Sequence, residues 1–195
     1  MSERILVGIT GASGSIYAKK LLERLIKLPY EIHLVISDMG KKVLSYELNT
    51  TPGAFIGAIS EIHPDNTLIT HESSNLFAPV ASGSFPVKAM VVIPCSMKTL
   101  ASVATGYTNN LLERAADVCL KERRPLILVT RESPLSRIHL ENQLRAHDAG
   151  ATILPASPGF YHHPATIDDL TESVVSRVLD HLGISDIKAS RWEGI

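Results

Sequence analysis

The chain has 195 residues, and its 19 lysines and arginines nearly balance its 20 aspartates and glutamates, so the net charge is −1 with neutral histidines. This balance excludes a global attraction to nucleic acid or to an anionic membrane, so any anion site must be local. The length favours a single domain over residues 1–195. No signal-type apolar segment opens the chain and no apolar run approaches the ~20 residues of a membrane span, which predicts a cytoplasmic protein without a membrane anchor.

Residues 5–10 form the first predicted strand, an apolar run that leads directly into a turn rich in glycine and serine. In this turn Gly11 and Gly14 allow the backbone to approach a ligand closely, and Ser13 and Ser15 add hydroxyl donors before a helix begins. The pattern predicts a phosphate site, although a plain strand-to-helix connection uses the same residue types. The glycines lie at positions 8, 11 and 14, a spacing that departs from G-x-G-x-x-G and favours a mononucleotide over NAD.

Predicted helices alternate with four further apolar runs, which predict strands at residues 31–37, 89–93, 125–130 and 151–154. This alternation is typical of a doubly wound parallel α/β sheet, the three-layer architecture of Rossmann-like and flavodoxin-like domains. Residues 49–88 are the least regular part of the chain, and only residues 67–70 predict a strand there.

Ligands of such a sheet bind at the carboxyl ends of the strands, so the loops that follow the strands should converge. These loops comprise residues 11–15, Ser37, residues 94–99 and residues 131–132. Ser37 and Ser96 each precede a predicted helix, where a serine caps the helix, contacts the ligand, or does both. Asp38 can imitate the ribose-binding acid of a dinucleotide fold, but we favour a cap and a hydroxyl contact from Ser37.

Charged residues in two places have competing interpretations. Arg131 and Glu132 follow a buried strand, where solvation explains a charged pair poorly, so we interpret them as functional. The run Lys121, Glu122, Arg123 and Arg124 ends a helix that begins near residue 109. Basic residues suit the negative end of a helix dipole, and we expect the two arginines of this run to face solvent.

The last predicted helix has an apolar stripe formed by Ile167, Leu170, Val174 and Val178, and the spacing predicts that Arg177 lies on the same stripe. Its guanidinium then either reaches a carboxylate at the edge of the core or contacts an anion. Both interpretations stay open at this point.

Three remaining features have structural interpretations. Adjacent His162 and His163 rarely ligate one ion and lack partners at metal-ligand spacing, so no metal is predicted. Cys95 and Cys119 lie in apolar surroundings, which predicts reduced, buried, structural thiols without a disulfide. Residues 183–195 form a tail containing Trp192, the only tryptophan, which we expect to pack over the active site or on a neighbouring subunit.

Seven motifs together identify a family. As they stand in the chain, they are VGITGASG at 7–14, SGSF at 82–85, PCSMKTLA at 94–101, NLLERAADV at 110–118, KERRPL at 121–126, RESPL at 131–135 and PGFY at 158–161. Six of the seven lie in predicted loops or at the ends of elements, where binding is expected. Over nearly its whole length the chain resembles the UbiX-type flavin prenyltransferases.

The resemblance implies an FMN-binding enzyme that joins the dimethylallyl group of dimethylallyl monophosphate to N5 and C6 of reduced FMN. The product, prenylated FMN, is then the cofactor of a partner decarboxylase. The resemblance also implies a homododecamer in which each flavin site is shared between subunits.

Residue by residue, the resemblance assigns FMN binding to Gly11, Ala12, Ser13, Ser37, Ser96, Met97, Lys98, Thr99 and Arg131. It assigns binding of the prenyl phosphate to Ser15, Lys121, Arg131, Tyr161 and Arg177. It implies that Glu132 transfers a proton and that Trp192 closes the site. Cationic donors of this kind take up the charge of a departing phosphate without a metal, and aromatic faces stabilise a cation-like allyl group.

Three other functions compete with this interpretation. A flavin-dependent cysteine decarboxylase would carry a catalytic histidine and an asparagine-bearing loop in place of residues 94–99, and neither is present. An aromatic-acid decarboxylase would need unmodified FMN to perform chemistry that only the prenylated form of FMN makes feasible. A non-catalytic FMN carrier leaves Lys121, Glu132 and Arg177 without a joint purpose.

Overall fold

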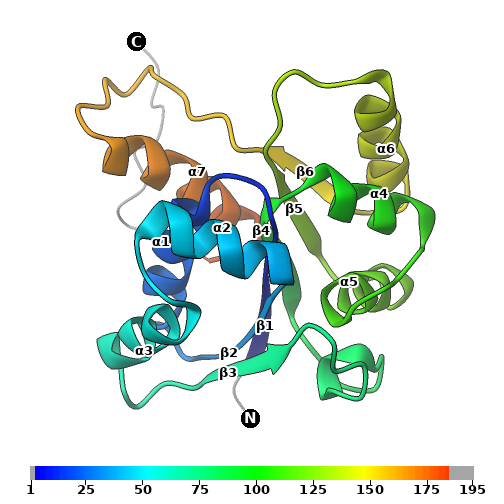
Figure 1. Ribbon diagram of the computed structural model, residues 1–195, viewed down its shortest axis with the longest axis horizontal. Coiled ribbons are helices and arrows are strands. Elements are labelled where there is room, and N and C mark those ends of the chain that lie inside the picture. Colours follow the sequence, from blue (N-terminus) through cyan, green and yellow to red (C-terminus); the bar gives the residue numbers. More distant parts are fainter. Residues whose placement is uncertain (1–2, 185–195) are drawn as a thin grey trace.

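The structure is built on a parallel sheet whose strands are β1 (Glu3–Ile9), β2 (Tyr30–Ile36), β3 (Leu68–Glu72), β4 (Ala89–Cys95), β5 (Leu126–Thr130) and β6 (Thr152–Pro155). The computed structural model describes residues 3–184, and in them the strand order is β3-β2-β1-β4-β5-β6 (Figure 1). All neighbouring strands pair in parallel, which confirms the predicted doubly wound α/β class. The strand order reverses direction between β1 and β4, and a crevice for a ligand opens at such a point.

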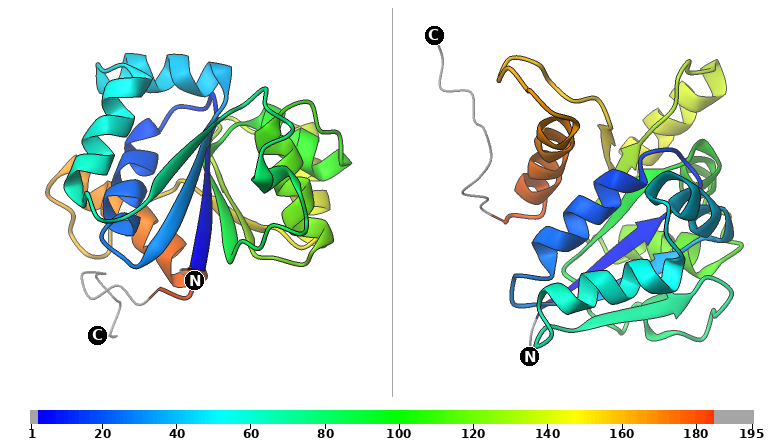
Figure 2. Two further views of the ribbon diagram at one scale, coloured as in Figure 1. Left: turned by 90° about the horizontal axis from the view of Figure 1, so that it is seen from below. Right: turned by 60° about the vertical axis from the view of Figure 1, so that its left-hand side comes forward.

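Helices cover both faces of the sheet (Figure 2). One face carries α1 (Ser15–Leu25), α3 (Pro52–Ile62) and α7 (Ile167–His181), with α2 (Asp38–Leu48) beside α1. The other face carries α4 (Met97–Thr105), α5 (Leu111–Lys121) and α6 (Arg137–Asp148), together with a short 3-10 turn, η1 (Pro79–Ala81). The fold is therefore the three-layer sandwich that the alternation of strands and helices predicts.

Residues of β1 show why a central strand reads as a continuous apolar run. Ile5, Val7 and Ile9 pack on the α1 and α7 face, whereas Leu6 packs on the α4 and α5 face. Both faces of the strand are buried, and burial of this apolar surface stabilises the fold by about 25 cal/mol per Å².

Helix α3 lies within residues 49–88, where the sequence predicted only the strand at 67–70, which is confirmed as β3. The start of α3 has clear local causes, because Thr51 accepts a hydrogen bond from the N–H of Ala54 and Pro52 occupies the first turn. Phe55 and Ile59, four residues apart, are buried against the core. The glycines in this segment obscured a helix that tertiary burial stabilises.

Within the part of the chain that the structure describes, none of the helices combines the length and the apolar character needed to cross a lipid bilayer. Cys95 and Cys119 are buried and free, as the reduced-thiol prediction requires, and burial raises the pKa of each thiol to about 12.

Candidate active site

The four predicted loops do converge at the carboxyl edge of the sheet. The Thr10 hydroxyl donates to the Pro94 carbonyl at 2.7 Å and accepts from the N–H of Ser96 at 2.8 Å, which joins the ends of β1 and β4. The N–H of Ser37 donates to the Ile9 carbonyl at 2.9 Å. Hydrogen bonds of the Thr10 hydroxyl and of the Ser37 N–H therefore hold the first three loops in a fixed relationship.

A cleft of about 510 Å³ opens among these loops. Its lining includes five predicted FMN-binding residues, namely Gly11, Ser37, Ser96, Lys98 and Thr99. It also includes Asp38, which the sequence analysis weighed as a ribose-binding acid and set behind Ser37. The residues of the lining that sequence reasoning missed are Met39, Ser73, Ser74, Asn109, Asn110, Leu112 and Glu113. Volumes of ~300–1,000 Å³ are usual for cofactor sites, so the cleft is large enough for a mononucleotide.

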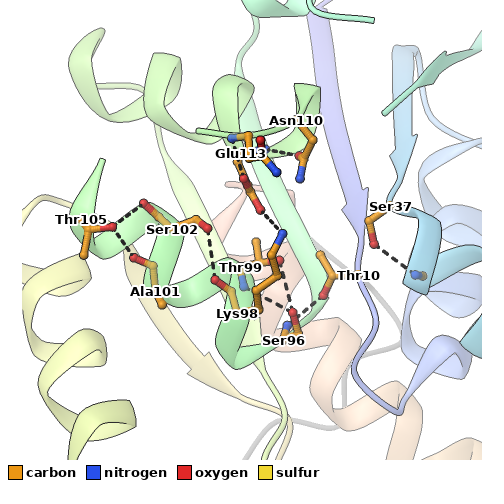
Figure 3. A network of polar contacts seen from close by, with 12 residues as sticks. Thr10, Ser37, Ser96, Lys98, Thr99, Ala101, Ser102, Thr105, Asn110 and Glu113 are labelled. Carbon is orange, nitrogen blue, oxygen red and sulfur yellow. Dashed lines mark hydrogen bonds and ion pairs between the residues drawn. The ribbon is translucent and has the colours of Figure 1, made fainter. Parts of the chain in front are cut away.

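Ser37 and Ser96 cap the helices that begin beside the cleft, as predicted. Ser37 accepts from the N–H of Gly40 at the start of α2, and Ser96 accepts from the N–H of Thr99 at the start of α4 (Figure 3). The hydroxyl oxygens of Ser96 and Thr99 lie 3.2 Å apart. Because both helices point their positive ends at the cleft, the site favours an anionic ligand with hydroxyl groups.

Lys98 reaches across the cleft to α5 (Figure 3). Its Nζ lies 3.0 Å from Oε1 of Glu113, and Glu113 also accepts from the N–H of Asn109 at 2.8 Å. Asn110 caps α5 by accepting from the N–H of Glu113. The sequence N-N-L-L-E contained this signal, because an N-cap asparagine followed three positions later by glutamate marks a helix start.

The glycine-rich turn after β1 binds a carboxylate, that of Glu47 on α2. The backbone N–H of Ser15 donates to Oε2 of Glu47 at 2.7 Å, and the N–H of Gly14 donates to the same oxygen at 3.0 Å. Gly14 has φ +117°, the left-handed conformation that aims these amides outward. The turn is therefore an anion site in fact, with a carboxylate in place of the predicted phosphate.

Glu47 was not among the predicted site residues, because nothing in α2 marks it as different from a solvent-facing glutamate. Partial burial opposes its ionisation, but hydrogen bonds from the Ser13 side chain and from the amides of Ser15 and Gly14 outweigh that effect. The net result holds the pKa of Glu47 below its ordinary value, so the carboxylate is charged at neutral pH.

The backbone at Gly11 lies in close contact with Met39 of α2. A Cβ on Gly11 would lie 2.7 Å from Cβ of Met39 on α2, so only glycine fits there. Ala12 and Ser15 are buried, whereas the Ser13 side chain is exposed beside the turn. Met97, the first residue of α4, is also buried.

Arg131 and Glu132 lie at the carboxyl end of β5, as predicted, and both are exposed. The N–H of Arg131 donates to the Cys95 carbonyl at 3.3 Å, which brings the fourth loop to the others. Burial raises the pKa of Tyr17 in α1, and the positive charge of Arg131 partly opposes this rise. Arg131 is therefore close enough to the first turns of α1 to act there.

Lys121 does not join these residues within one chain. It ends α5, five residues before β5 begins, so it lies at the amino edge of the sheet. Its ammonium pairs with Glu122, beside Gly83. The length of β5 alone, about 16 Å at ~3.3 Å per residue, separates this edge from Arg131.

Arg177 also departs from its prediction, because it does not lie on the apolar stripe. Its side chain is 63% exposed, and Nη1 pairs with Asp180 on the same helix at 3.1 Å. The buried face of α7 runs instead through Thr171, Val174, Val175, Val178 and Leu179, and Ile167 at the start is exposed. At 100° per residue, Arg177 falls outside that face.

The position of Arg177 along α7 likewise separates it from Ser15. Lys20 on α1 pairs with Asp168 at 2.5 Å, which sets the middle of α1 level with the start of α7. Arg177 lies nine residues further along α7, about 13 Å at 1.5 Å per residue.

Tyr161 lies in the loop before α7, is 58% exposed, and stacks edge-on with His162 at 5.5 Å. Trp192 and most of the predicted tail lie outside the described residues. No group of three or more histidine, cysteine or acidic side chains that would suit a metal ion occurs among residues 3–184.

Comparison with known proteins finds relatives that match nearly the whole chain. The flavoprotein family model matches residues 1–179. The flavin prenyltransferase UbiX of Alkalihalophilus pseudofirmus is 48% identical over 198 aligned positions, covering 98% of this chain and 99% of that protein. The corresponding enzyme of Pseudomonas aeruginosa is 46% identical over 196 positions, covering 97% of this chain and 94% of its own length.

A solved structure of AnUbiX (PadA1) in complex with FMN and dimethylallyl pyrophosphate superposes with a TM-score of 0.92 at 41% identity, covering 100% of both chains. The FMN-dependent cysteine decarboxylase TvaF superposes with a TM-score of 0.62 over 94% of this chain and 99% of its own, at only 12% identity, so it shares the fold alone.

Proposed function

Because the chain belongs to the flavoprotein family, and within it to the UbiX-type flavin prenyltransferases, we propose that it transfers a dimethylallyl group to N5 and C6 of reduced FMN. The donor is dimethylallyl monophosphate, and the product serves a partner decarboxylase in the cytoplasm. One observation carries the proposal: an amide turn that holds a carboxylate opens beside a hydroxyl-lined cleft at the same edge of the sheet.

The cleft suits FMN by the chemistry of its donors. Hydroxyl groups of Ser37, Ser96 and Thr99 and two helix N-termini meet there, and a phosphorylated polyol pairs well with such a set. Bound FMN supplies the nucleophilic ring atoms that receive the prenyl group. Gly11, Ala12, Ser13, Met97, Lys98 and Arg131 complete the proposed FMN site.

The prenyl phosphate is proposed to bind near Ser15 and Arg131. The amides of the turn at Gly14 and Ser15 already hold one anionic oxygen, that of Glu47. When the C–O bond of the donor breaks, phosphate carries away the electron pair, and a guanidinium such as that of Arg131 stabilises the charge that develops. Tyr161 offers an aromatic face to the cation-like allyl group.

Lys121 and Arg177 are proposed to reach this phosphate from a second subunit. Each lies far from Ser15 within its own chain, as the positions on α5 and α7 require. The solved UbiX-like decarboxylase from Escherichia coli O157:H7, 43% identical with a TM-score of 0.90 over 98% of this chain and 100% of its own, is dodecameric. A homododecamer of this chain would bring these cations to neighbouring sites, and Trp192 would close them.

The second bond joins C6 of the flavin to one carbon of the dimethylallyl double bond. The other alkene carbon takes up the proton that N5 lost on alkylation, and C6 loses its own proton. We assign the removal of this proton to Glu132, which is exposed at the end of β5 beside Arg131. Its carboxylate accepts the proton and the departing phosphate carries it away.

Anaerobic incubation with reduced FMN and dimethylallyl monophosphate, followed by mass spectrometry of the extracted flavin, tests the reaction. The expected product is heavier than FMN by one five-carbon unit. The Glu132→Gln variant should bind FMN but should not form this product. Unmodified flavin on well-folded wild-type protein would overturn the proposal and favour a carrier. Release of carbon dioxide from an aromatic acid by the purified chain with FMN alone would favour a decarboxylase.

A further inference from the structure

Glu113 is the most deeply buried charged group at the cleft. Its side chain is 1% exposed, although it lines the cleft at the third position of α5. A carboxylate removed from water this completely needs partners for both oxygens, because an unpaired buried charge is strongly destabilising.

The two carboxylate oxygens of Glu113 have partners from different elements. Oε1 accepts from Nζ of Lys98 on α4, and Oε2 accepts from the N–H of Asn109 in the loop before α5. Helix capping explains the second contact, since a glutamate at this position often bonds back to the preceding loop. It does not explain the first, which ties one wall of the cleft to the other.

Lys98 gains a fixed position from this contact. Its side chain is 71% exposed, and a lysine in that environment normally samples many rotamers. The buried carboxylate instead holds its ammonium at the cleft wall. The pair is also neutral, so the negative charge of Glu113 does not repel an anionic ligand.

We infer that Glu113 is a positioning residue for the flavin. Its carboxylate holds Lys98 and Asn109 in place, so that the N-termini of α4 and α5 form one preformed wall of the cleft. This inference rests on the proposed binding of FMN in that cleft. It assigns Glu113 no contact with the reacting atoms.

Glu113→Gln tests the inference with nearly unchanged shape. Glutamine has one acceptor oxygen where the carboxylate has two, so its amide NH2 must face either the Lys98 ammonium or the Asn109 N–H, which are both donors. We expect the Kd for FMN, followed by flavin fluorescence, to rise about tenfold, as the loss of a hydrogen bond to a charged group predicts. The KM for dimethylallyl monophosphate at saturating FMN should stay within about twofold, because the pair faces the flavin cleft.

A double-mutant cycle with Lys98→Gln separates positioning from general destabilisation. Lys98→Gln leaves the Glu113 carboxylate unpaired against an anionic ligand, and its Kd for FMN should also rise about tenfold. Adding Glu113→Gln to that variant should cause no further loss, because the repelling charge is removed. Glu3→Gln is the control: it breaks the Lys88–Glu3 pair at the opposite edge and should leave FMN binding unchanged.

The outcomes are distinct. Wild-type affinity in Glu113→Gln, strictly additive losses in the double variant, or a matched rise in the KM for the prenyl phosphate would each overturn the inference. If Glu113→Gln does not fold, Lys98→Gln still tests the inference, because the Lys98 side chain is exposed. An unchanged FMN affinity in Lys98→Gln would overturn the inference. Wild-type protein that binds FMN but forms no prenylated flavin would refute the proposed function and leave the role of Glu113 standing.

Discussion

The N–H of Ser15 donates to the carboxylate of Glu47 at 2.7 Å, across 32 residues of sequence. This contact fills the amide turn after β1 with a negative charge from α2. The anion site that the glycine-rich turn predicts is therefore satisfied within the chain.

Replacing Glu47 by glutamine should lower stability at pH 7 and flatten its dependence on acid pH. The pKa of Glu47 lies below the ordinary value of 4.5, so its contribution is complete above pH 4.5 and is lost as the pH falls through the lowered pKa. We expect the Tm at pH 7 to fall by about 2–4 °C, the shift for ~1 kcal/mol in a protein of this size. Thermal unfolding of the wild type and of Glu47→Gln from pH 7 to pH 3 measures this. Plots of Tm against pH that run parallel for the two proteins would contradict it.

Ser96→Ala should reduce both stability and FMN affinity. The substitution removes the cap of α4, worth about 1 kcal/mol, and a hydroxyl from the cleft. Thr51→Ala is the matched control, because it removes the cap of α3, which lines no part of the cleft. Both variants should lose similar Tm in thermal unfolding, and only Ser96→Ala should raise the Kd for FMN. A Kd for FMN that is the same in Ser96→Ala and in Thr51→Ala would exclude a ligand contact from Ser96.

Lys121→Gln and Glu132→Gln should each be inactive alone and active when mixed. In one chain these residues lie at opposite edges of the sheet, so a common site draws them from different subunits. Random mixing pairs an intact Glu132 with an intact Lys121 in about a quarter of the sites. Co-expression followed by a flavin prenylation assay measures the recovery. Mixed oligomers without activity would refute a shared site.

Cys95 and Cys119 should resist thiol reagents in the native protein. Burial raises the pKa of both to about 12, so almost no thiolate exists at pH 8. Titration with a chromogenic disulfide should detect both thiols in denaturant and neither within minutes in buffer. Fast labelling of native protein would show local opening at β4 or α5.

Several features follow from local sequence alone. The apolar runs predict five of the strands to within two residues at each end, because strands buried on both faces need continuous apolar surface. The caps at Ser37 and Ser96 follow from the affinity of a serine oxygen for free helix N–H groups. Convergence of the loops follows from parallel topology, since the carboxyl ends of all strands share one edge.

Other features required the tertiary structure. Glu47 and Glu113 look in the sequence like ordinary helix residues, and only the packing of α2 on the turn and of α4 against α5 places their carboxylates at the site. Lys121 and Arg177 carry the right chemistry for a phosphate, yet each lies far from Ser15 in its own chain. Local pattern predicts the elements and their ends, although it placed Arg177 on the wrong face of α7. Proximity across the molecule depends on how the elements pack.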